Sequence, residues 1–159
     1  MRGRRNRWAR SPLVDARGAP ATVSGVLPYN IDHVAIAVRD LEEAVERHMQ
    51  LYGVEPLSTE VVESQGVIEA MIPIGGSYVQ LIQPLGPETP VGRFIERRGE
   101  GLHHLAFAVS DIDDALRSLA EAGAVLVDEE PRTGGRGARI AFVHPRTMAG
   151  TLVELVELP

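Results

Sequence analysis

Four polar residues occupy matched positions in two similar halves of the chain, and their types are those of metal ligands. Residues 31–44 read IDHVAIAVRDLEEA and residues 102–115 read LHHLAFAVSDIDDA, which places His33 and His104 at the same point of an internal repeat. Gln80 in YVQLIQ and Glu154 in LVELVE match in the same way near the end of each half. Each half therefore contributes one imidazole and one side-chain oxygen.

Two imidazoles, an amide oxygen and a carboxylate suit Co²⁺, Mn²⁺, Ni²⁺, Zn²⁺ or Fe²⁺ better than Ca²⁺ or Mg²⁺. On a six-coordinate ion these four ligands would leave two positions for a chelating substrate, which is what Lewis-acid catalysis requires. A single histidine on an inward strand face is more often a hydrogen-bonded core residue, but the symmetric pair favours ligands. His103 competes with His104, and both strand alternation and the repeat select His104.

The elements that must position these residues follow from local patterns. Residues 31–38 are β-branched and apolar, which predicts a strand that carries His33 on a face of small residues. Asp40 and Gly53 mark the ends of a helix over residues 41–52. Three more strands are expected at residues 57–63, 66–73 and 77–83, with Gly75 and Gly76 turning the last two into a hairpin.

The second half repeats this order. A strand at 102–109 and a helix at 112–122, between Asp111 and Gly123, precede strands at 125–128, 138–144 and 151–157. The sequence thus predicts an α+β fold of two tandem βαβββ modules (30–84 and 100–159) in one domain. A linker at 85–99, with a helix over 91–98, joins them. The modules are expected to form an open, cupped, eight-stranded sheet.

The composition restricts the possible functions. The 159 residues include no cysteine and no lysine, which excludes disulfides, thiolate ligands and Schiff-base chemistry. Residues 1–29 form an arginine-rich stretch that we expect to be a disordered leader. The remainder carries ten arginines against 21 acidic residues, so neither a nucleic-acid partner nor a membrane segment is expected. A cytoplasmic location is the default expectation.

The repeated βαβββ unit with its H…Q…H…E pattern resembles the vicinal oxygen chelate (glyoxalase/extradiol dioxygenase) superfamily. Within it, the segments QGVIEAMIPIGGSYVQLIQP, GEGLHHLAF and FVHPRTMAGTLVEL are similar to the methylmalonyl-CoA epimerase family, over residues 31–159. The resemblance implies that His33, Gln80, His104 and Glu154 bind a divalent metal, with Co²⁺ favoured. It also implies that Glu69 is an acid/base residue and that the protein forms a homodimer.

The expected reaction is interconversion of (2R)- and (2S)-methylmalonyl-CoA by removal and return of the α-proton through a metal-stabilised enolate. Two bases on opposite faces would be needed, and Glu69 and Glu154 are the candidates, although a metal-bound glutamate is a weakened base. Candidate substrate contacts are Arg136 and Arg139 for the coenzyme A phosphates, and Thr147 or Gly150 for the substrate carboxylate. Arg93, Arg97 and Arg98 on the linker helix are further phosphate candidates.

Other functions remain open at this stage. The same ligand set would serve a glyoxalase-type lyase, whereas a ring-cleaving dioxygenase needs more open metal positions than Gln80 would leave. A metal-free, drug-sequestering binding module of this superfamily would typically lack the four inward ligands. Ethylmalonyl-CoA is an alternative substrate.

Overall fold

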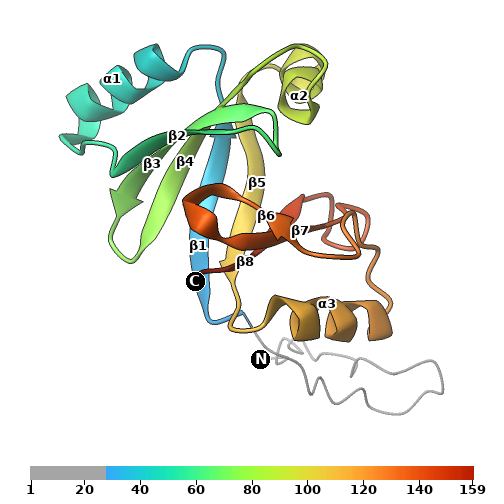
Figure 1. The fold of residues 1–159 in the computed structure, drawn as a ribbon. Helices are drawn as coiled ribbons and strands as arrows, with labels where there is room; N and C mark the ends of the chain where they lie inside the picture. The colour runs from blue at the N-terminus through green and yellow to red at the C-terminus, as the bar shows by residue number, and fades with distance from the viewer. Residues whose placement is uncertain (1–27) are drawn as a thin grey trace, which may run out of the picture.

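One sheet of eight strands, in the order β2-β3-β4-β1-β5-β8-β7-β6, forms the body of the molecule in the computed structural model, which describes residues 28–159 (Figure 1). The first module supplies β1 (Asn30–Ala37), α1 (Leu41–Tyr52), β2 (Ser58–Val62), β3 (Val67–Ile74) and β4 (Ser77–Pro84). The second supplies β5 (Gly101–Ala108), α3 (Ile112–Glu121), β6 (Arg132–Thr133), the 3-10 turn η1 (Gly135–Gly137), β7 (Arg139–Val143) and β8 (Val153–Glu157), and α2 (Pro90–Arg98) lies between the modules.

The strand order is symmetric about the centre of the sheet. β1 pairs in parallel with β4, β5 pairs in parallel with β8, and β1 and β5 lie side by side and antiparallel (Figure 1). The hairpin β3–β4 turns at Gly75, whose φ of 60° suits glycine. This arrangement confirms the predicted α+β fold with its eight-stranded, curved sheet.

The helices begin and end where the sequence predicts. The Asp40 side chain accepts a hydrogen bond from Glu43 N at 3.0 Å, and Asp111 accepts one from Asp114 N at 2.8 Å. On the outer face of the sheet α1 packs in one apolar cluster and α3 in another, built around Leu41 and Ile112. On the inner face α2 packs against β1, β4 and β5, with Val91 and Ile95 in an apolar cluster that includes Ala35 and Ala37 of β1. The small inward residues of β1 therefore face α2, while the larger apolar residues face α1.

One predicted strand is wrong. Residues 125–128 form only an isolated bridge between Leu126 and Val143 of β7. The reason is that the Asp128 side chain accepts a 2.9 Å hydrogen bond from Phe142 N and so replaces the next rung of the ladder. Regular pairing with β7 resumes only at β6, which is two residues long.

No helix within residues 28–159 is long and apolar enough to span a membrane. The arginine-rich leader is predicted for residues 1–29. Of these, residues 1–27 lie outside the described part of the chain.

Candidate metal centre and active site

Two β-bulges at the centre of the sheet each place one extra residue beside a repeat histidine. In the β1–β5 ladder His33 faces Ala106 and Ala35 faces His104, so the two histidines are related by the symmetry of the modules. The register skips the residue before each of them, Asp32 on β1 and His103 on β5. A bulge redirects the side chain of the extra residue, and here both side chains turn toward the neighbouring imidazole.

Three side chains converge at the point between the modules. The Nε2 atoms of His33 and His104 lie 3.2 Å apart, and Glu154 Oε2 lies 3.0 Å from the first and 3.2 Å from the second. All three residues are buried, and their potential ligand atoms lie close enough together to bind one metal ion. The predicted pair of histidines and the predicted glutamate are therefore brought together.

The far nitrogen of each imidazole is held by the residue from the bulge. His33 Nδ1 lies 2.7 Å from Asp32 Oδ1, and His104 Nδ1 lies 2.8 Å from His103 Nδ1. Burial, followed by the charge of His104, lowers the pKa of His103 to about 4, so its neutral ring can accept a hydrogen bond from His104 Nδ1–H. Such contacts fix the tautomer in which Nε2 carries the lone pair and faces the centre.

In the metal-free protein a proton takes the place of a cation. Burial alone would lower the pKa of His33, but its contacts with Asp32 and Glu154 outweigh burial and raise the pKa to about 9. Burial also works against the charge on Glu154, yet contacts with His104 and His33 lower the pKa of Glu154 to about 2. The centre therefore holds a carboxylate and an imidazolium, and a divalent cation would displace the imidazolium proton.

The fourth predicted ligand, Gln80, occupies the place in its ladder that corresponds to Glu154. Gln80 lies beside Ala35 in the β1–β4 ladder, as Glu154 lies beside Ala106 in the β5–β8 ladder. Gln80 Oε1 is buried and has no hydrogen-bond partner among residues 28–159, whereas Glu154 Oε2 meets the two histidine Nε2 atoms. An orphaned buried acceptor is costly unless a donor or a cation satisfies it. The donor set and the Gln80 oxygen both fit a divalent metal.

Glu69 is joined to this group by a hydrogen bond. Its Oε2 accepts from Gln80 Nε2 at 2.7 Å, and the residue is only 2% exposed. Burial, followed by the charge of Glu60 on the opposite strand, raises the pKa of Glu69 to about 7. The Glu69 side chain thus points inward, and a carboxyl with this pKa can both take up and release a proton near neutral pH.

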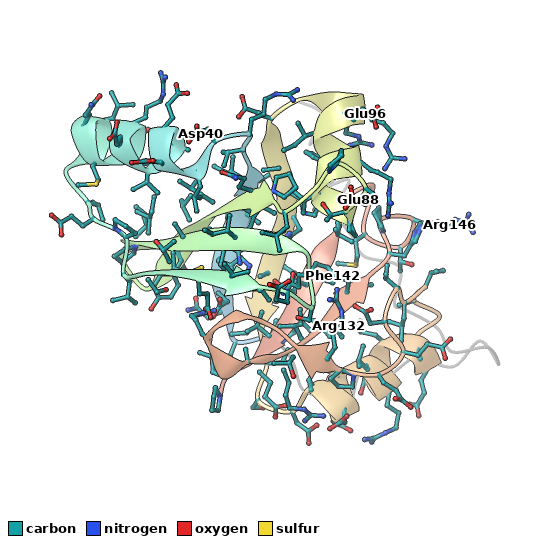
Figure 2. The ribbon with its side chains drawn as sticks, turned by 45° about the horizontal axis from the view of Figure 1, so that its top comes forward. Asp40, Glu88, Glu96, Arg132, Phe142 and Arg146 are labelled. Carbon is teal, nitrogen blue, oxygen red and sulfur yellow. The ribbon has the colours of Figure 1, made fainter. Side chains whose placement is uncertain are left out.

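A cavity of about 800 Å³ opens beside the cluster. Its walls come from α2, from the 64–67 turn and from β5, β7 and the 145–152 loop, and His104 is the member of the metal cluster that lines it. Phe142 packs edge-on against the His104 ring at 5.3 Å, and the Arg132 guanidinium lies 5.4 Å from the Phe142 ring centre. Figure 2 shows Arg132 and Phe142 next to each other below the strands of the first module. The volume suits a ligand of cofactor size.

The candidate arginines divide between the cavity and other places. Arg97 and Arg98 line the cavity, as does Arg132, which the sequence analysis did not single out. Arg139 does not line it and instead pairs with Asp113 and Glu157, each at 2.8 Å. Arg93 donates to a backbone oxygen at the start of α2 and also lies outside the lining.

The remaining candidates divide in the same way. Gly150 lines the cavity. Thr147 does not, because its hydroxyl oxygen accepts a hydrogen bond from Val125 N at 2.8 Å. Arg136 forms an ion pair with the buried Asp32 and is likewise absent from the lining.

Sequence reasoning also missed Asp32, and it treated His103 only as a rival of His104. The repeat contained a signal for both, because Asp32 and His103 are the residues that precede the two matched histidines. That signal contradicts simple strand alternation, which turns neighbouring residues to opposite faces, and only the bulges resolve the contradiction.

Comparison with known proteins agrees with this architecture. Residues 32–142 match the model of the glyoxalase/bleomycin resistance protein/dioxygenase superfamily. The chain is 37% identical to the ethylmalonyl-CoA/methylmalonyl-CoA epimerase of Cereibacter sphaeroides, over 80% of this chain and 97% of that protein.

Solved structures extend the likeness to three dimensions. The methylmalonyl-CoA epimerase of Streptomyces coelicolor, solved in complex with 2-nitronate-propionyl-CoA, is 41% identical, with a TM-score of 0.79 over 81% of this chain and 94% of that chain. The methylmalonyl-CoA epimerase of Mycobacterium tuberculosis is 37% identical, with a TM-score of 0.81 over 84% of this chain and 91% of that one. The chain therefore belongs to the glyoxalase/bleomycin resistance protein/dioxygenase superfamily and, within it, to the methylmalonyl-CoA epimerase family.

Proposed function

We propose that this protein interconverts (2R)- and (2S)-methylmalonyl-CoA with a divalent metal ion held by His33, Gln80, His104 and Glu154. The observation that carries the proposal is the convergence of three buried ligand atoms within 3.2 Å, next to a cavity of about 800 Å³, in a member of the epimerase family. The unpartnered Oε1 of Gln80 supports a fourth ligand.

A cation at this position would act as a Lewis acid that stabilises the negative charge developing on the thioester oxygen. Mixed imidazole and oxygen donors favour a transition metal, and we expect Co²⁺ to support the reaction best, with Mn²⁺, Ni²⁺, Zn²⁺ and Fe²⁺ as the other candidates. Asp32 and His103 hold the Nδ1 side of each imidazole, so that both Nε2 atoms are directed to the centre.

Glu69 is proposed to exchange the α-proton on one face of the substrate. Its carboxyl is buried, and its pKa of about 7 makes it a far stronger base than an ordinary glutamate. The hydrogen bond from Gln80 fixes its orientation. Inversion then needs a second proton donor on the opposite face.

Glu154 is the proposed group for that second face. Its low pKa, set by His104 and His33, makes it a better ligand than base. Its two oxygens allow both roles, with Oε2 directed at the histidines and Oε1 proposed for proton transfer. Neither glutamate lines the cavity, but their ladder partners Ile82 and Phe142 do, so the acyl group is proposed to reach the carboxyls past these two residues.

Coenzyme A carries phosphates that need cationic partners, and the cavity supplies three. Arg97, Arg98 and Arg132 line it, which makes them better candidates for the phosphates than Arg136 and Arg139, both of which are engaged by carboxylates. Gly150 stays a candidate for contact with the substrate carboxylate.

Three further expectations belong to this proposal. Ethylmalonyl-CoA is a second candidate substrate, because the Cereibacter sphaeroides relative is named for both acyl-CoA esters. A homodimer is expected because β2 and β6 leave open sheet edges. The expected location is the cytoplasm.

The test is solvent isotope exchange. Protein loaded with Co²⁺ is incubated in D₂O with each epimer of methylmalonyl-CoA, and α-deuterium uptake is followed by mass spectrometry alongside epimer composition. Metal-free protein corrects for spontaneous exchange. Fast, metal-dependent exchange with inversion is expected.

Absence of exchange above the control, with bound metal verified, would refute the epimerase proposal. The next substrates to test would then be the glutathione adducts of a glyoxalase-type lyase. Equal exchange with and without metal would refute the metal-dependent mechanism while leaving the substrate assignment intact.

A further inference from the structure

We propose that Arg136, from the second module, is a positioning residue that holds Asp32 and thereby orients the metal ligand His33. The inference rests on the metal-binding role of His33 proposed above. It replaces the expectation that Arg136 binds the phosphates of the substrate.

The first observation is the chain of contacts from Arg136 to the centre. Its guanidinium forms a charged hydrogen bond with Asp32 Oδ1, and the same oxygen accepts from His33 Nδ1 at 2.7 Å. Asp32 is 5% exposed and His33 is 3% exposed, so water is largely excluded from both contacts. The guanidinium also stacks 5.2 Å from the ring centre of Tyr78, which lies beside His33 in the β1–β4 ladder. A planar cation between a carboxylate and an aromatic face is a contact that lysine cannot reproduce.

The second observation is that the backbone of Arg136 is itself fixed. Its φ of 56° and ψ of 20° lie in the left-handed region, which residues with a Cβ seldom adopt without outside support. That support comes from the first module, because Arg136 N donates a 2.8 Å hydrogen bond to Glu60 Oε1. The neighbouring Gly135 lies against Glu69, and a Cβ there would come within 2.3 Å of Glu69 Oε1. The η1 turn of the second module thus contacts two groups of the first module: Asp32, which holds the proposed ligand His33, and the proposed base Glu69.

The third observation concerns charge. When His33 donates its lone pair to a cation it is neutral, and Asp32 is then a buried carboxylate that receives only one neutral N–H from His33. A buried carboxylate without a cationic partner is unfavourable. Arg136 supplies that charge, so the ion pair stabilises the arrangement in which His33 Nε2 is free to bind metal.

The test compares Co²⁺ binding by the full-length wild-type protein with that of Arg136→Met, Asp32→Asn and the double variant. Dissociation constants come from competition with a chelator, and the visible absorption of bound Co²⁺ reports its coordination. Loss of an outer contact of this kind typically weakens metal binding about 10- to 100-fold. We expect about tenfold for Arg136→Met, with an altered Co²⁺ spectrum.

The double variant distinguishes action through Asp32 from action elsewhere. If Arg136 works through Asp32, Arg136→Met has no further effect in the Asp32→Asn protein. Arg136→Lys keeps the positive charge and serves as a control for misfolding of Arg136→Met. We expect it to restore the Co²⁺ affinity only in part. Arg117→Met is the matched control, because Arg117 pairs with Asp114 on the exposed face of α3.

Wild-type affinity and an unchanged spectrum in Arg136→Met would overturn the proposal, and so would additive losses in the double variant. Failure of wild-type protein to bind Co²⁺ would overturn it together with the metal centre. Because the readout is metal binding without substrate, a negative isotope-exchange result would refute the epimerase function and leave this inference standing.

Discussion

The Gln80 side chain donates a 2.7 Å hydrogen bond to Glu69, and its own oxygen, Oε1, is buried without a partner in the part of the chain that the structure describes. The two polar atoms of this amide therefore have different proposed roles. Nε2 binds the proposed base Glu69, and Oε1 is available as a metal ligand. The hydrogen bond favours the ionised form of Glu69, while burial and Glu60 favour the neutral form. In the proposed mechanism Gln80 would therefore link metal binding to proton transfer.

Replacing this amide with a carboxylate tests the link. In Gln80→Glu an oxygen ligand is retained, but the donor to Glu69 is lost and a second negative charge faces it. We expect the pH at which activity falls on the acid side to rise by about one pH unit, because the added charge disfavours the carboxylate form of Glu69. The pH dependence of kcat/KM measures this shift. Gln50→Glu on the exposed side of α1 is the control, and an unmoved acid limb would contradict the coupling.

Removing the base itself has a different expected result. Glu69→Gln keeps the shape of the side chain and should lower the epimerisation rate by about 10² to 10⁴, the usual contribution of a positioned acid or base. The epimer whose α-proton is removed by the base on the opposite face should still take up deuterium. The variant should therefore exchange the α-proton of that epimer without inverting its configuration. Exposed Glu63→Gln serves as the control. Equal loss of exchange from both epimers would show that Glu69 serves more than one face.

The pKa of Glu69 also predicts a pH profile for the wild-type protein. Its raised value of about 7 means that lowering the pH protonates the base, so deuterium uptake through Glu69 should fall as pH drops. A cation nearby favours the carboxylate, which moves the midpoint below 7 in the loaded enzyme. The rate of deuterium uptake, measured in samples quenched at fixed times between pH 5 and 8, gives this midpoint. The deuterium uptake that remains in Glu69→Gln should not show this fall at low pH.

The repeat made the fold and most of the metal cluster predictable. Matching His33 with His104 and Gln80 with Glu154 gave the relative positions of four side chains without any coordinates, because equivalent strands of two equal modules place equivalent residues about one axis. The features that failed depend on interactions the sequence does not display. Asp128 breaks the β7 edge ladder by a side-chain hydrogen bond, and the pairing of Arg136 with Asp32 joins residues 104 positions apart.

Metal binding should release a proton. His33, with a pKa of about 9, is protonated at pH 7.5 in the metal-free protein, whereas Glu154 is already ionised. We expect about one proton to leave for each Co²⁺ bound at pH 7.5 and almost none at pH 10, where His33 is already neutral. Calorimetric titrations in buffers of different ionisation enthalpy give this number. Binding without proton release at pH 7.5 would mean that His33 is neutral before the metal arrives.

Arg132 is a cavity arginine whose side-chain hydrogen bonds are all long. Its contacts with Asp128 Oδ2 and Ser64 O are both long at 3.4 Å, and its guanidinium lies over Phe142 (Figure 2). A charge-assisted hydrogen bond contributes about 1.5–3 kcal/mol, so Arg132→Met should raise KM for methylmalonyl-CoA about tenfold with little change in kcat.

Steady-state kinetics at low and high salt, with Arg117→Met as the control, measure the effect of Arg132→Met, which salt should weaken because the contact is ionic. The decisive comparison uses methylmalonyl-pantetheine, which lacks the nucleotide phosphates. On that substrate Arg132→Met and wild type should have the same KM. An equal loss on both substrates would mean that Arg132 supports Phe142 and, through it, the His104 ring, and that the phosphates bind at Arg97 and Arg98 instead.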